Sequence, residues 1–62
     1  MTDELPEDRR RVLFEALVSA QDEGLSVAAS RELVAGRYSV TVEQVRAVEQ
    51  EGLRQGWPPL DG

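Results

Sequence analysis

Residues 33–54 read LVAGRYSVTVEQVRAVEQEGLR, and this stretch decides the fold. Thr41 with Gln44 forms the S/T-x-x-E/Q capping box that is typical of the first turn of a helix. The valines on either side of this box occupy the two positions of a hydrophobic staple, which is a second, independent start signal. We therefore predict a helix over residues 42–55 that begins after a break in the chain.

A second helix is predicted directly upstream, over residues 27–37, where Ser26 can cap the first turn and most residues favour helix. Ala35 provides the small side chain that two closely crossing helices need. The short turn between the helices needs a residue with positive φ, and this place falls to Ser39, although glycine adopts that conformation at the lowest cost. Helix, short turn and capped helix together predict a helix-turn-helix, which presents its second helix to the major groove of DNA.

The same stretch resembles the helix-turn-helix of region 4 of the primary bacterial sigma factors. The pattern of that family is an aromatic residue, Gly-Val-Thr, and then a helix with an R-x-R-V-R-Q-I-E-like core. The matching residues here are Tyr38, Val40, Thr41, Glu43, Val45, Arg46, Val48, Glu49, Leu53 and Arg54. The resemblance implies promoter recognition by the helix at 42–55 and docking of the domain on the flap of RNA polymerase.

This chain departs from the family pattern at positions that would contact DNA. The family tends to have arginines where this sequence has Val42 and Gln44, so two phosphate or base donors are missing. Three residues can still contact DNA. Thr41 can bind a phosphate, the Glu43 carboxylate can accept from a cytosine amine, and the Arg46 guanidinium can donate to a guanine. The full set of residues that we expect to contact DNA is Thr41, Glu43, Gln44, Arg46, Gln50, Arg54 and Arg37.

The formal charge of the 62-residue chain is -5 at pH 7, and all seven basic residues are arginines. Because nucleic-acid binding draws most of its affinity from neutralised phosphates, this charge opposes tight, autonomous binding. Glu51 is predicted to lie on the outward face of the third helix, where its negative charge would repel the DNA backbone. The one arginine run, residues 9–11, is interpreted as a solvated face paired with neighbouring acids, with phosphate contact as the alternative. We thus predict DNA binding that is weak or assisted by a partner.

The first helix is predicted over residues 6–23, because apolar residues recur there at a spacing of three and four, and Gly24 can end it. Its apolar stripe is predicted to contain Val12, Leu13, Ala16, Leu17 and Ala20, widened by Phe14 and Val18. After the third helix, residues 56–62 are predicted to form an extended Trp-Pro-Pro tail. Trp57 and Leu60 either close the bottom of a small core, which we favour, or anchor a partner protein.

The sequence predicts one all-α domain over residues 1–62, a three-helix bundle with flexible ends at 1–5 and 61–62. Because cysteine and histidine are absent, disulfides, thiolate or imidazole metal sites and histidine-activated nucleophiles are excluded. Since no phosphate loop is found either, we expect no enzyme activity, cofactor, metal or small-molecule substrate. Without an apolar run of roughly 20 residues we expect a cytoplasmic protein that does not enter membranes.

Two classes of function stay open. The first is a small transcription-related protein that contacts DNA through the third helix, and the second is an adaptor that binds RNA polymerase or a larger regulator without reading DNA. Leu33 and Val42 point outward in the predicted bundle. They belong either to an interface, with a partner or with a second copy of the chain, or to a core that extends to the first helix. The residues assigned to partner binding are Leu33, Val42, Trp57 and Leu60. A DNA-mimicking inhibitor is disfavoured, because the acids are spread over all three predicted helices.

Overall fold

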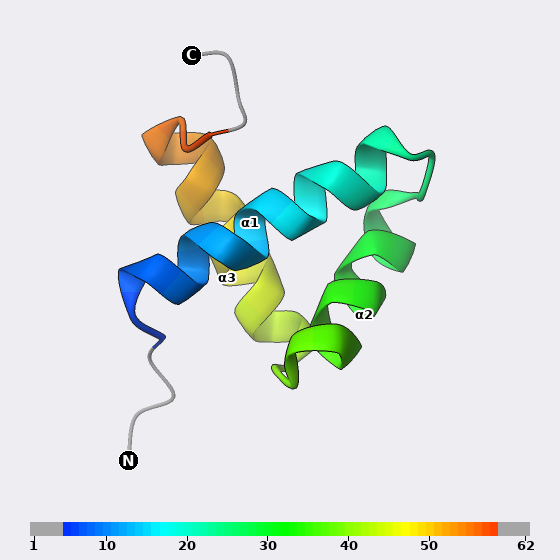
Figure 1. Ribbon diagram of the computed structural model, residues 1–62, viewed down its shortest axis with the longest axis horizontal. Helices are drawn as coiled ribbons and strands as arrows, with labels where there is room; N and C mark the ends of the chain where they lie inside the picture. The colour runs from blue at the N-terminus through cyan, green and yellow to red at the C-terminus, as the bar shows by residue number, and fades with distance from the viewer. Residues whose placement is uncertain (1–4, 59–62) are drawn as a thin grey trace.

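Three helices make up the fold in the computed structural model, which describes residues 5–58. They are α1 (Glu7–Asp22), α2 (Val27–Tyr38) and α3 (Val42–Gln55), and the described residues contain no strand. In Figure 1, α1 crosses in front of α3 while α2 lies to one side of both, and each helix packs against the other two. The predicted all-α bundle is confirmed, with every helix end within one residue of its predicted position.

Side-chain caps begin both α2 and α3, as the sequence predicts. The Ser26 hydroxyl accepts a hydrogen bond of 3.1 Å from the backbone N–H of Ala29. The Thr41 hydroxyl accepts from the N–H of Gln44 at 3.0 Å, and the Gln44 side-chain carbonyl accepts from the N–H of Thr41 at 2.9 Å. These bonds satisfy N–H groups that have no partner within the helix, so they fix where each helix starts.

The break between α2 and α3 depends on one residue in the left-handed conformation. Ser39 has φ of 58°, as predicted, and the next N–H, that of Val40, donates to the Ala35 carbonyl at 3.0 Å. Gly56 has nearly the same conformation at the end of α3, with φ of 69°. The chain therefore uses serine at one helix end and glycine at the other for the same backbone geometry.

Exchanging these two residue types is expected to change stability in opposite directions. Ser39→Gly is expected to raise the free energy of unfolding by about 0.5–1 kcal/mol, because glycine adopts positive φ without a clash at Cβ. Gly56→Ala is expected to lower it by a similar amount for the reverse reason. Thermal unfolding followed by circular dichroism measures both, and shifts of the same sign would contradict this account.

The buried core draws on all three helices. Its members are Leu13, Phe14, Leu17, Val34, Ala35, Val45, Val48 and Trp57. The stripe predicted for α1 is rotated in the structure, because Val12 is 43% exposed whereas Phe14 is 1% exposed. α1 must cover α3 as well as α2, and the Phe14 ring is the side chain that faces Gly52 of α3.

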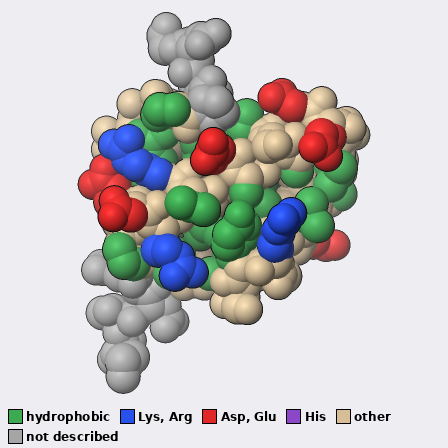
Figure 2. All heavy atoms as spheres, viewed as in Figure 1, with side chains coloured by type: hydrophobic (Ala, Val, Ile, Leu, Met, Phe, Trp, Pro, Cys, Tyr) green, Lys and Arg blue, Asp and Glu red, His purple; other side chains and the backbone are tan. Residues whose placement is uncertain are grey.

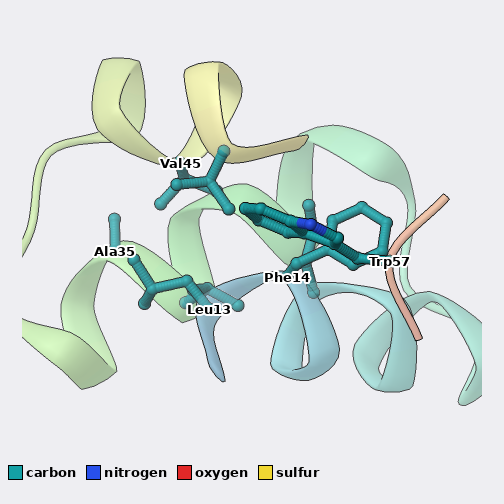
Figure 3. Close-up of a cluster of buried hydrophobic side chains, with 8 residues drawn as sticks. Leu13, Phe14, Ala35, Val45 and Trp57 are labelled. Carbon is teal, nitrogen blue, oxygen red and sulfur yellow. The ribbon is translucent and has the colours of Figure 1, made fainter. Parts of the chain in front are cut away.

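Trp57 belongs to this core. Its ring is 4% exposed and meets Phe14 edge to face, with ring centroids 6.1 Å apart, while the Arg11 guanidinium lies 5.1 Å from the Trp57 ring centroid. Figure 3 shows the two aromatic rings side by side, below Val45. The favoured prediction, that Trp57 closes the core, is confirmed, and its burial leaves little surface for the partner binding that was also predicted for it. Leu60 and the rest of the predicted tail from residue 59 onward lie outside the described residues.

Leu5 belongs to the N-terminal stretch, residues 1–5, for which the sequence predicts flexibility. Leu5 is half-buried and packs against the core, and its carbonyl accepts a hydrogen bond from the Arg10 guanidinium. This contact ties the chain to the bundle before α1 begins. Residues 1–4 and 61–62, for which flexibility was also expected, lie outside the described part.

Candidate functional site

The exposed surface of α3 is the strongest candidate for a binding site. Arg46 and Ala47 are adjacent, and each lies three or four residues from both Glu43 and Gln50, so the four residues share one face of α3. The same four residues line a shallow depression on the surface. Arg54 continues this face four residues further along. We call these five residues the α3 stripe.

Two further glutamates of α3 lie outside the stripe and form ion pairs with arginines of the other two helices. Glu51 binds Arg10 of α1 through two contacts, of 2.8 Å and 3.0 Å, and Glu49 binds Arg31 of α2 at 2.8 Å. These side chains are only 15–29% exposed, so the pairs lie partly inside the helix junctions. The prediction that Glu51 points outward is wrong, because Arg10, 41 positions earlier in the chain, draws it toward α1.

The electrostatic character of the stripe follows from these pairs. Its charged members are two arginines and one glutamate, although the chain as a whole carries a charge of -5. Arg46 and Arg54 form no ion pair within residues 5–58. Both residues are exposed. The stripe therefore offers cationic donors to an external anion on an otherwise acidic protein.

The structure brings together only part of the predicted DNA-contacting set. Glu43, Arg46, Gln50 and Arg54 lie on the stripe. Thr41 and Gln44 are instead engaged with each other in the capping box, and Gln44 is half-buried. Arg37 is not on the stripe either, because it belongs to α2 and lines a different surface.

That different surface is a groove between α1 and α2 with a volume of about 340 Å³. Its apolar lining includes Val12 and Ala16 from α1 and Leu33 and Tyr38 from α2. Figure 2, which views the molecule from the α1 side, shows apolar side chains gathered near the centre of this face with charged side chains around them. The sequence does not predict this groove, because Val12 fits the helical period of α1 and is therefore assigned to the core.

The arginine run at residues 9–11 agrees with the prediction only in part. Arg11 pairs with Glu7, one turn earlier in α1, at 2.9 Å, and the Arg11 side chain also covers Trp57. Arg10 departs from the prediction, because its partner is not a neighbouring acid but Glu51 of α3. Two of the three arginines thus have structural roles at the surface of the bundle.

No group of three acidic side chains in residues 5–58 is arranged to hold a metal ion. In the same range, none of the helices combines the length and apolar character needed to cross a bilayer. Comparison of the chain with protein-family models, curated proteins and solved structures finds no match.

Proposed function

We propose that the chain is a small, transcription-related DNA-contacting module in which α2, residues 39–41 and α3 act as a helix-turn-helix similar to that of sigma factor region 4. The observation that carries this proposal is the charge of the α3 stripe. Because Glu49 and Glu51 are bound to arginines of α1 and α2, the stripe presents arginines to solvent with a single acid among them. In this proposal α3 is the helix that enters the major groove.

The packing behind α3 supports the same proposal. The chain leaves α2 at Tyr38 and starts α3 at Val42, with three residues between them. Ala35 is 7% exposed at this junction, where a larger side chain would hold α2 and α3 apart. Val45 and Val48 are buried on the opposite side of α3 from the stripe. The stripe is therefore fixed on the outside of a rigid support, as groove recognition requires.

Each polar residue of the stripe matches a chemical feature of DNA. The Arg46 guanidinium can bind the two acceptors of a guanine, and the Glu43 carboxylate can accept from a cytosine amine. The Gln50 amide can pair with adenine, which offers a donor and an acceptor. Arg54, further along the stripe, is placed for a phosphate contact. With so few cations, affinity is low without help, which agrees with a partner-assisted role.

We expect the loss of Arg46 to weaken duplex binding and to reduce its salt dependence. If the wild-type chain neutralises about two phosphates, the logarithm of its association constant should fall with the logarithm of the salt concentration at a slope of roughly -2. If Arg46 contacts one of these phosphates, Arg46→Ala should change the slope to about -1. If Arg46 instead reads guanine, the variant should lose about 1–3 kcal/mol of discrimination between sequences. Anisotropy of a labelled duplex library at about 50 mM salt and above measures both quantities.

The matched control is Arg9→Ala, which removes the same charge from an exposed position on α1. Binding that falls equally in both variants would mean that only total charge matters and that α3 has no special role. A wild-type chain that binds no duplex at about 50 mM salt would also refute the proposal.

The second candidate is an adaptor that binds a protein, such as RNA polymerase or a larger regulator, and not DNA. The exposed apolar lining of the α1–α2 groove favours it, since Leu33 is 47% exposed and Val12 is 43% exposed. For this candidate, charge reversal at Glu43 tests whether a partner uses the α3 stripe. Reversal at Glu51 is unsuitable, because it would break the pair with Arg10 and destabilise the bundle.

A further inference from the structure

The α1–α2 groove joins an apolar floor to an acidic rim. Val12 of α1 and Leu33 of α2 are exposed apolar side chains of its lining, and Ala16 and Tyr38, which also line it, are partly buried. Exposed apolar side chains that adjoin one another and are rimmed by charge are typical of a surface that another molecule covers. The groove is therefore an apolar surface that no other part of residues 5–58 covers.

The charges on the lining specify what could cover it. Glu15 of α1 and Glu23, the residue directly after the helix, line the groove eight residues apart, which corresponds to roughly 12 Å along a helix. Neither forms an ion pair within the described part of the chain, whereas Glu7, Glu49 and Glu51 each bind an arginine. On the α2 side the charged lining residue is Arg37, which also has no ion-pair partner among residues 5–58.

We propose that the α1–α2 groove binds an amphipathic helix of a partner protein, one with an apolar stripe and a row of basic side chains along one flank. The apolar stripe contacts Val12 and Leu33. The basic flank lies along α1, where Glu15 and Glu23 accept two cations about two helical turns apart. An acidic side chain on the opposite flank meets Arg37, so the charges of the groove define the orientation of the bound helix.

A second copy of the chain is a poorer occupant than such a helix. Both copies carry a formal charge of -5, and the groove lining itself has two acids against one arginine, so two grooves facing each other would repel. The groove and the depression on α3 share no lining residue. The proposal therefore rests on the groove alone and holds whether or not the α3 stripe contacts DNA.

The test uses two synthetic helical peptides of about 14 residues with the same leucine stripe. One carries lysine and arginine on the flank that meets α1 and glutamate on the other flank, and the second has these charges reversed. Titration into the isotope-labelled full chain is followed by NMR. The basic-flank peptide should shift the amide signals of groove residues and bind at least about tenfold more tightly than the reversed peptide.

Paired variants locate the contact. Leu33→Glu should abolish binding of the basic-flank peptide, whereas Leu53→Glu, on a leucine that is 59% exposed and outside the groove, should not. Glu15→Lys with Glu23→Lys should reverse the preference between the peptides, whereas Glu43→Lys should leave it unchanged. Equal affinity for both peptides, no binding by either, or signals that shift only on α3 would overturn the proposal. Sedimentation that shows a dimer lost in Leu33→Glu would assign the groove to a second copy instead.

Discussion

Trp57→Ala is expected to remove a large part of the protein's free energy of unfolding. Removing a large buried aromatic side chain costs about 3–5 kcal/mol, which includes the cavity that it leaves. A chain of 62 residues has a total stability of only about 3–9 kcal/mol, so this loss amounts to between about a third and all of it. The loss falls on α1 above all, because Phe14 would lose its edge-to-face partner and Arg11 would lose the ring that it covers. Urea unfolding followed by circular dichroism gives the change directly.

Two further variants show whether the effect comes from the core. Trp57→Phe keeps an aromatic ring against Phe14 and should retain a cooperative unfolding transition. Leu53→Ala, four residues earlier in the chain and 59% exposed, should change the free energy of unfolding by less than about 0.5 kcal/mol. If Trp57→Ala were as stable as Leu53→Ala, Trp57 could not be a member of the core.

Gly52→Ala is expected to destabilise the protein, although alanine is normally the better helix former. A Cβ atom at position 52 would overlap the Phe14 ring, since it would lie 2.7 Å from the ring's Cγ and closer still to two other ring carbons. Phe14 is 1% exposed and is held by Trp57, so the ring cannot swing aside. The cost of such overpacking is about 1–3 kcal/mol or more, which exceeds the gain of about 1 kcal/mol in helix propensity.

Gly36→Ala is the matched control, because position 36 is also inside a helix but has open space where the alanine Cβ would lie, with no neighbouring atom within 4 Å. This variant should gain about 0.5–1 kcal/mol in stability from helix propensity alone. On thermal unfolding the two variants should therefore shift the midpoint in opposite directions. A rise in midpoint for both would show that α1 and α3 do not approach closely at Gly52.

The features that sequence predicts correctly are those decided by residues close together in the chain. The capping box at Thr41, the cap at Ser26 and the positive φ at Ser39 each involve partners within about four positions, so local chemistry determines them. The burial of Trp57 was predictable for a different reason, because a chain this short has few large apolar side chains from which to build a core.

The features that sequence predicts wrongly depend on contacts between distant helices. The orientation of Glu51 is set by Arg10, and no periodicity within α3 contains that information. Val12 fits the helical spacing of α1 as well as Phe14 does, but Gly52 gives space only to the Phe14 ring. These two long-range choices create the α3 stripe and the α1–α2 groove, so the candidate sites are less predictable than the fold.

The place of Trp57 also gives the protein an internal optical reporter. It is the chain's one tryptophan, so all indole emission comes from this site, and that emission moves to longer wavelength when the ring enters water. The ring lies against Phe14 and Arg11 and lines neither the α3 depression nor the α1–α2 groove. Its spectrum should therefore change when the core opens and stay constant when a ligand binds, which separates the two events in a single unlabelled sample.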